Sequence, residues 1–143
     1  MVEQVSVFLE NKSGRLAELT RTLGDAGINM HALMVADTSD FGVARIICDA
    51  PERALSLLDE AGFGASIARV LAVEVPDRPG GLADLLEALL GAELNVEYAY
   101  CFVDPSGDAA IDVFRVDDQR AESVLSAAGF RVLTPADLYS PDA

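Results

Sequence analysis

The chain has 143 residues, 51% of them hydrophobic, and a positive mean hydropathy, so it has ample apolar material for a folded core. Its 24 acidic and 10 basic residues give a net charge of −14, which would repel nucleic-acid backbones and anionic lipid. No apolar run approaches the roughly 20 residues of a membrane-spanning helix, and residues 1–4 lack the features of a signal peptide. We therefore expect a cytoplasmic protein that binds neither nucleic acid nor a membrane.

In the first half of the chain the hydrophobic period changes from that of a strand to that of a helix. Apolar residues alternate over 5–9, and over 16–23 they recur at helical spacing. Gly24 and Gly27 mark the end of this helix, and Gly62 stands where a second helix would be capped. The expected order is strand 5–9, helix 16–23, strand 28–36, strand 43–48, helix 54–61 and strand 63–68.

The second half of the chain repeats this pattern. Aligned on Gly14 and Gly80, equivalent leucines lie 66 residues apart, whereas in the second helices the spacing is 67. The extra residue is most simply placed in the Pro/Ser/Gly turn 104–108, because loops absorb insertions and helices do not. The second copy is expected to have strand 71–75, helix 82–89, strand 94–103, strand 110–116, helix 121–128 and strand 130–134.

The order βαββαβ, present twice, predicts an α+β fold of two ferredoxin-like modules, residues 1–68 and 69–143, each an antiparallel sheet with helices on one face. A module this small is marginally stable alone, so we expect the two to pack together. The strand 28–36 carries apolar residues on both faces. This pattern predicts that the helix-free face is covered, either by the other module or by a second chain in a homodimer. We expect the C-terminal residues 139–143 to fray.

A glycine loop joins the first strand to the first helix in each copy, at residues 11–16 and 77–82. A helix N-terminus offers unpaired N–H groups and partial positive charge, and glycine lets a ligand approach the backbone, so this loop suits a carboxylate. In the alternative interpretation Asn11, Ser13 and Asp77 cap the helices. Lys12 and Arg15 either add charge to a carboxylate contact or are solvated. The turn 37–42 either closes over a ligand or is an ordinary hairpin turn.

The loop pattern N/D-x-x-G-x-L, the segment Ala26-Gly27-Ile28-Asn29 before the second strand and the duplicated βαββαβ order resemble the ACT domain family, in two copies over about residues 2–133. The resemblance implies an amino-acid sensor for allosteric regulation, with its ligand at the interface between modules. The ligand-binding residues it implies are Asn11, Ser13, Gly14, Arg15, Leu16, Asn29, Asp77, Pro79, Gly80, Gly81, Leu82 and Asn95. The second loop departs from the first, with Asp77 for Asn11 and Gly81 for Arg15, which argues against equal affinity at the two loops.

The sequence contains no recognisable catalytic or metal-binding constellation. His31 is the single histidine and lies within a predicted strand, while Cys48 and Cys101 lack metal-ligand spacing and are expected to be small buried hydrophobes. We therefore expect no enzymatic activity, no cofactor and no metal, with a small enzyme lacking familiar motifs as one alternative. Another alternative is a regulatory subunit that docks onto an amino-acid biosynthetic enzyme through its apolar sheet face and binds little ligand itself.

Overall fold

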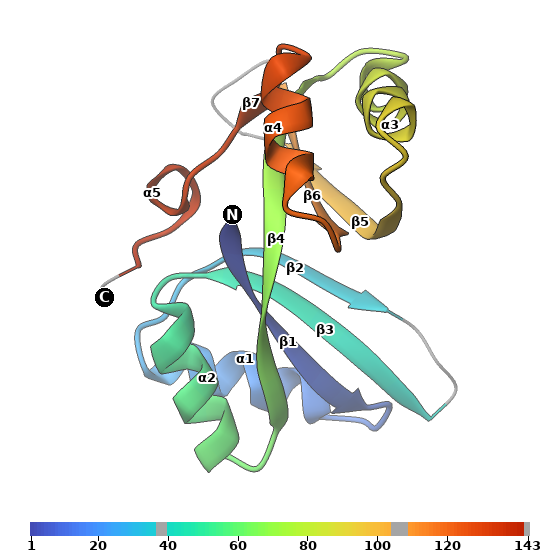
Figure 1. The fold of residues 1–143 in the computed structure, drawn as a ribbon. Coiled ribbons are helices and arrows are strands. Elements are labelled where there is room, and N and C mark those ends of the chain that lie inside the picture. Colours follow the sequence, from blue (N-terminus) through green and yellow to red (C-terminus); the bar gives the residue numbers. More distant parts are fainter. Residues whose placement is uncertain (37–39, 104–108, 142–143) are drawn as a thin grey trace. The chain divides into compact units, whose positions relative to one another are not determined.

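The computed structural model describes residues 1–36, 40–103 and 109–141 (Figure 1). The elements are β1 (Val2–Glu10), α1 (Arg15–Asp25), β2 (Met30–Ala36), β3 (Phe41–Cys48), α2 (Pro51–Glu60), β4 (Gly64–Pro76), α3 (Gly81–Gly91), β5 (Val96–Val103), β6 (Ala109–Val116), α4 (Arg120–Ala127), β7 (Arg131–Val132) and α5 (Pro135–Leu138). The predicted order βαββαβ is confirmed for both copies. One long strand, β4, ends the first copy and begins the second. Within the described ranges, no helix is long and apolar enough to cross a membrane.

The chain divides into two compact units. The first unit comprises Glu3–Ala68 and Pro135–Ala143, and the second comprises Met1–Val2 and Arg69–Thr134. The predicted modules are residues 1–68 and 69–143. In the structure the first two residues belong to the second unit, and the segment from Pro135 onward belongs to the first. Each unit therefore includes a piece of chain that the sequence periodicity assigns to the other copy.

In the first unit the strands lie in the order β2-β3-β1-β4. The β1–β3 and β2–β3 pairs are antiparallel, with Ala44 of β3 opposite Val7 on one side and Val35 on the other. Alternate residues of β1 are buried in one core with the apolar faces of both helices, so α1 and α2 cover the same face of the sheet (Figure 1). The core residues from these elements are Val5, Val7, Leu9, Leu19, Leu23, Ala54 and Leu58.

The second unit repeats this connectivity. β5 pairs with β6, β6 with β4, and the short β7 pairs with β4 on its other side, all antiparallel. Its core joins β4 to the buried faces of α3 and α4, through Leu71, Val73, Leu85, Leu89, Ala121 and Leu125. A fully buried leucine contributes roughly 1.5–3 kcal/mol, so this helix-to-sheet packing is what fixes each unit. The predicted fold, two ferredoxin-like modules, is confirmed.

The sheet registers show that the two copies differ by more than one inserted residue. Val7 lies opposite Ala44 in the first unit, and Val73 lies opposite Asp112 in the second. Val73 comes 66 residues after Val7, but Asp112 comes 68 residues after Ala44. In the following helices the buried leucines Leu58 and Leu125 are 67 apart. The prediction of a single insertion is therefore wrong, because it was read from helix residues and skipped the strands. Residues 104–108, where it was placed, lie outside the described residues.

The C-terminal segment packs onto the first unit instead of fraying. Tyr139 is 6% exposed, and its hydroxyl accepts a hydrogen bond of 3.0 Å from the Glu3 amide. The Ser140 carbonyl accepts a bond of 2.7 Å from the Ala50 amide, and the Ser140 amide donates one of 2.6 Å to the Asp49 carboxylate. The prediction of a frayed tail is wrong for Tyr139 and Ser140, because it weighed position in the chain and not burial. Asp142 and Ala143 lie outside the described residues.

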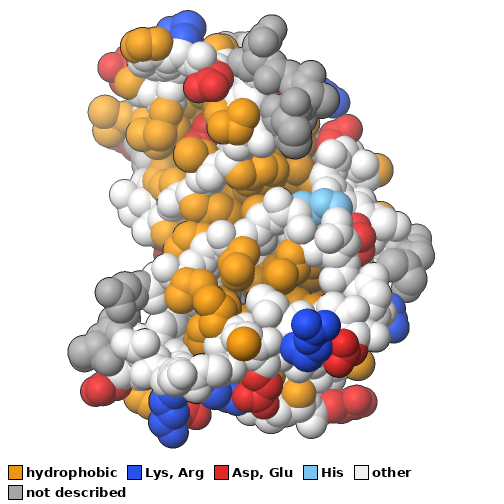
Figure 2. Space-filling view, turned by 180° about the vertical axis from the view of Figure 1, so that it is seen from behind, with side chains coloured by type: hydrophobic (Ala, Val, Ile, Leu, Met, Phe, Trp, Pro, Cys, Tyr) orange, Lys and Arg blue, Asp and Glu red, His pale blue; other side chains and the backbone are white. Residues whose placement is uncertain are grey.

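Hydrophobic side chains also reach the surface (Figure 2). Both β2 and β5 are outer strands of their units. Along each strand exposed residues alternate with partly buried ones, so one face of the strand is exposed and the other is partly buried. Cys101 on β5 is exposed, so its predicted burial is wrong, whereas Cys48 is buried. The exposed large hydrophobic residues are Phe8, Leu16, Leu33, Val35, Phe41, Leu82, Leu86, Leu90 and Val103.

Candidate functional site

The two glycine loops have the same backbone conformation. The Lys12 amide donates to the Glu10 carbonyl at 2.8 Å, and the Arg78 amide donates to the Pro76 carbonyl at 2.9 Å. Gly14, with φ of 88°, and Gly80, with φ of 85°, occupy the N-cap positions of α1 and α3. This left-handed conformation favours glycine over residues with a Cβ. The repeat that the sequence indicates therefore extends to the geometry of the loops.

No side chain caps α1 or α3 from the N-cap position, because glycine stands there in both. The capping interpretation of Asn11, Ser13 and Asp77 is wrong at that position. The Asn11 amide donates instead to the Asp40 carbonyl at 3.0 Å, which ties the loop to the start of β3. The first helical amides already have acceptors within the chain, since the Arg15 amide donates to the Lys12 carbonyl at 3.3 Å and the Gly81 amide to the Arg78 carbonyl at 3.1 Å. The N–H groups that follow in the first turn have no partner within the helix, so an acceptor from outside the chain would have to bind there.

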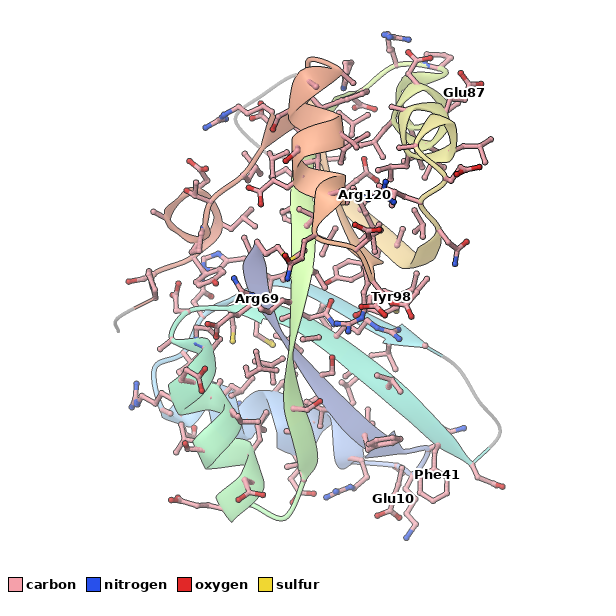
Figure 3. The ribbon with its side chains drawn as sticks, viewed as in Figure 1. Glu10, Phe41, Arg69, Glu87, Tyr98 and Arg120 are labelled. Carbon is pink, nitrogen blue, oxygen red and sulfur yellow. The ribbon has the colours of Figure 1, made fainter. Side chains whose placement is uncertain are left out.

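The first loop borders a cavity of about 220 Å³ in the first unit. It is lined by Leu9, Glu10, Asn11, Lys12, Leu16, Val35, Ala36 and Gly42. Figure 3 shows Glu10 beside Phe41 at this end of the sheet, where the two residues are paired on β1 and β3. Lys12 Nζ lies 2.9 Å from Glu10 Oε2, and this contact holds the pKa of Glu10 below its usual value. The cavity thus combines an apolar wall with one positive and one negative group.

The structure brings only part of the predicted first-loop set to this cavity. Asn11 and Leu16 line it, whereas Ser13 and Gly14 are exposed in the loop and do not. Arg15 does not line it either: its guanidinium lies 4.3 Å from the centre of the Phe63 ring and 2.8 Å from the Glu18 carboxylate. Asn29 precedes β2, at the end opposite Val35 and Ala36, which at strand spacing is about 20 Å away.

The second loop is arranged differently. A Cβ on Gly81 would lie 2.3 Å from the Pro76 carbonyl oxygen, although Arg15 occupies the equivalent position of the first loop. Arg78 is held by Asp84 at 2.9 Å and by the Pro79 carbonyl at 3.2 Å. Asp77, Pro79, Gly80 and Leu82 are exposed, as is Asn95 before β5. These findings are consistent with the unequal loops that the sequence indicates.

A cavity of about 290 Å³ in the second unit lies elsewhere. It is lined by Glu74, Val75, Pro76, Ala109, Ala128, Gly129, Phe130 and Arg131, none of them a predicted site residue. An ion pair of 2.9 Å joins Arg131 to Glu74 at its edge. The predicted second-loop residues are therefore not brought together by this cavity.

Sequence reasoning missed several residues of the first cavity. Val35, Ala36 and Gly42 lie far from the loop in sequence, and only the pairing of β1, β2 and β3 brings them to it. Glu10 had a usable signal, since it directly precedes the loop and stands two residues from Lys12. A Cβ on Gly42 would lie 2.7 Å from the Ala36 carbonyl oxygen, so close packing of backbone explains the glycine there.

Sequence reasoning also missed a buried acid. Asp112 of β6 is only 4% exposed, and no described residue donates a hydrogen bond to its carboxylate or pairs with it. Burial raises the pKa of this carboxyl above its usual value. The signal was the interruption of an apolar strand, Ala109–Val116, by one acidic residue.

Replacing Asp112 with asparagine is expected to raise the free energy of unfolding at neutral pH by about 1 kcal/mol, because the cost of burying an unpaired charge is removed. The folded pKa of Asp112 is raised, so its destabilising effect begins as pH rises above the ordinary aspartate pKa of 3.8 and is complete above the folded pKa. Urea denaturation of both proteins at neutral pH and below pH 3.8 measures this. A variant that is less stable at neutral pH would show that the carboxylate has a favourable partner.

Other reactive groups are held in structural contacts. Burial raises the pKa of the Cys48 thiol to about 12, so this cysteine stays protonated and unreactive. His31 Nε2 lies 2.9 Å from the Asp49 carboxylate. The pKa of Asp49 is lowered, first by the Ser140 amide and then by His31. Among the described residues, no group of three or more His, Cys, Asp and Glu side chains could hold a metal ion.

Comparison with known proteins agrees with this fold. The chain is similar to the crystal structure of protein BT0572 from Bacteroides thetaiotaomicron, at 34% identity and a TM-score of 0.90, over 99% of this chain and 96% of that one. It is also similar to the regulatory subunits of aspartate kinase from Thermus thermophilus and Thermus flavus, at 19% identity, with TM-scores of 0.66 and 0.65. These two cover 89% of this chain and 89% and 90% of their own, which shows a shared fold. No curated protein matches the chain.

One sequence family covers almost all of the chain. Its description is an ACT domain pair, and residues 1–139 match it. The match spans both copies of the βαββαβ order, both glycine loops and the docked C-terminal segment up to Tyr139. This chain therefore belongs to the ACT domain pair family.

Proposed function

We propose that this protein is a non-catalytic regulatory sensor and that it binds a free amino acid in the cavity at the first glycine loop. The observation that carries the proposal is the composition of the cavity wall, in which Lys12, Asn11 and Glu10 face a space otherwise bordered by apolar residues and Gly42. An amino acid has a carboxylate, an ammonium group and a side chain, and this wall offers a complement to each. Membership of the ACT domain pair family and a fold shared with regulatory subunits of aspartate kinase support the regulatory role.

The charges of the cavity suggest how the ligand is oriented. Its carboxylate would bind at the part of the wall that Asn11 and Lys12 line. This part lies next to the N-terminus of α1, where the helix dipole favours an anion. Its ammonium group would bind Glu10, whose lowered pKa keeps it ionised. The Glu10–Lys12 ion pair is exposed, and exposed pairs contribute little to stability because solvent screens them. A zwitterionic ligand can therefore replace it at little cost.

The size of the cavity limits the ligand class. Pockets for drug-sized molecules occupy roughly 300–1,000 Å³, whereas this one has about 220 Å³. At Gly42 the cavity wall is backbone only, because any side chain there would meet the Ala36 carbonyl. Leu9, Leu16 and Val35 form the apolar part, which favours an amino acid with a small or medium apolar side chain.

Filling the cavity is expected to abolish the response to the ligand. In a thermal-shift series with the twenty amino acids at millimolar concentration, one chemical class should raise the melting midpoint, because a ligand at about 100 times its Kd stabilises by about 2.7 kcal/mol. Val35→Trp should remove this shift, since Val35 lines the cavity. Leu33→Trp is the matched control, because Leu33 has nearly the same exposure on the same strand and face but does not line the cavity.

Two results would contradict the proposal. If no amino acid at millimolar concentration shifts the wild-type melting midpoint, the protein does not bind amino acids in this concentration range. If Val35→Trp keeps the full shift, the ligand binds outside this cavity. Loss of the shift in Leu33→Trp as well would point to a general effect on β2 instead of the cavity.

A second candidate function is docking, either of two copies as a homodimer or of this chain on an amino-acid metabolic enzyme. Phe8 is 68% exposed and Phe41 58% exposed, and aromatic groups are enriched at protein interfaces. We expect Phe8→Glu to weaken self-association at least tenfold, measured by sedimentation over a concentration series. Its exposed side chain lies outside the core, so the variant should fold. A wild-type protein that stays monomeric throughout would exclude the homodimer and leave the enzyme partner.

A further inference from the structure

The second unit contains a position that corresponds to the wall of the first cavity. Val35 and Gly42 line that cavity, and both are neighbours of Ala44, Val35 across the β2–β3 pair and Gly42 two residues away on the same face. The equivalent neighbourhood in the second unit consists of Cys101, Ala110 and Asp112, because Cys101 lies opposite Asp112 across the β5–β6 pair. Where the first unit has the methyl group of Ala44, the second has a carboxylate.

Packing does not require an acid at this position. Ala44 fills it in the first unit with no exposure, and the neighbours of Asp112 on its own face include Val73 and Phe114, which are fully buried. Burying a carboxylate without a partner costs more free energy than burying an alanine methyl group. Only 4% of Asp112 is exposed, and no described residue pairs with it. Groups that reduce stability in this way are enriched at functional sites.

The charges around this position disfavour an anionic ligand. The loop beside it has Asp77 where the first loop has Asn11, and the equivalent of Lys12 is Arg78, which is already bound to Asp84 at 2.9 Å. Both Asp112 and Asp77 are acidic, so each would repel a ligand carboxylate that bound nearby. A ligand with a positive charge and no carboxylate would instead pair with Asp112, which has no partner among the described residues.

We propose that the second unit binds a small primary ammonium ion, with Asp112 as its counter-ion and Leu82, Cys101 and Ala110 around its alkyl chain. This site is separate from the amino-acid cavity of the first unit. The three flanking residues are equivalent to Leu16, Val35 and Gly42, which line that cavity. The difference between the two sites is therefore one of charge: the first accepts a zwitterion and the second a cation.

An organic ammonium ion fits this position better than a metal ion. Hard cations such as Ca²⁺ and Mg²⁺ take six or more oxygen ligands, and no group of acidic, cysteine or histidine side chains among the described residues could hold one. A primary ammonium ion needs one carboxylate for a charge-assisted hydrogen bond, and its alkyl chain gains from apolar neighbours. Leu82 and Cys101 are both exposed, so two of the residues proposed to flank the alkyl chain are accessible from solvent.

The test uses the full chain and n-butylammonium chloride as the probe. Isothermal titration and amide chemical shifts should detect its binding to the wild type, with the largest shifts at Cys101 and Asp112. n-Butanol tests the apolar contribution, and potassium chloride at equal concentration controls for ionic strength. Asp112→Asn should weaken binding at least tenfold while the protein stays folded. Glu87→Gln is the matched control, because Glu87 is an exposed acid that points away from α3 (Figure 3) and should leave binding unchanged.

The outcomes separate this site from the amino-acid cavity. Val35→Trp should keep the full response to n-butylammonium even if it loses the response to amino acids, so either site can fail alone. Equal binding to wild type and Asp112→Asn would overturn the proposal, and so would an effect no larger than that of potassium chloride. Binding that n-butanol reproduces would show an apolar pocket with no role for the carboxylate, which also overturns it.

Discussion

Replacing Gly81 with alanine is expected to lower the free energy of unfolding by about 3 kcal/mol, at the upper end of the usual cost of overpacking. The new Cβ would lie 2.3 Å from the Pro76 carbonyl oxygen and 3.2 Å from a Val75 methyl group. The closer atom belongs to the backbone, so it cannot turn away as a flexible side chain would. Either β4 or the start of α3 must move, and both support the core of the second unit.

The matched control is the neighbouring glycine. Gly80 has φ of 85°, but a Cβ there would meet only the end of Arg78 at 3.8 Å. Gly80→Ala should therefore cost about 1 kcal/mol, the strain of a left-handed alanine. Urea denaturation followed by circular dichroism measures both variants. Equal losses in the two would show that the loop relaxes freely and that the close contact at Gly81 has no energetic weight.

Replacing Tyr139 with alanine is expected to cost about 3 kcal/mol of stability, as large-to-small substitutions of buried aromatic residues do. The ring is 6% exposed, and its hydroxyl accepts the Glu3 amide hydrogen bond. Its loss should also free Ser140 from Ala50 and Asp49, because these contacts depend on the same docked segment. Hydrogen exchange at the amides of Glu3 and Ala50 should therefore accelerate together with the loss of stability.

Tyr139→Phe separates packing from the hydrogen bond. It keeps the buried ring and removes only the hydroxyl, so it should cost about 1 kcal/mol and speed exchange at Glu3 but not at Ala50. If Tyr139→Ala leaves exchange at Ala50 unchanged, the backbone contacts of Ser140 hold the segment without the ring. In that case the contacts of Tyr139 and Ser140 form independently of each other and do not form one cooperative unit.

The two copies keep the same scaffold and differ in chemistry. Their loops share backbone hydrogen bonds and glycine conformations. The side chains around those loops differ in charge, with Lys12 and Glu10 beside one and Asp77 and Asp112 in the neighbourhood of the other. If both proposed sites bind their ligands, the chain would respond to two chemically different molecules, one zwitterionic and one cationic.

The sequence by itself determined the order of elements and the fold class. The change from period 2 to period 3.6 after each glycine loop is a local property of the backbone, so residues 5–9 and 16–23 reveal a strand and a helix without any tertiary contact. The repeat made each assignment twice, and the resemblance of the loops identified the family. Gly14 and Gly80 were found for the same reason, since a left-handed turn before a helix selects glycine locally.

Only the tertiary structure decided which residues meet. Val35, Ala36 and Gly42 join the first loop through strand pairing, and pairing register depends on contacts between segments distant in sequence. The same registers placed Asp112 opposite Val73 and corrected the single insertion that helix residues had indicated. Tyr139 was misjudged because burial of a terminal segment depends on the surface it finds, which is a property of the folded unit and not of the tail's own sequence.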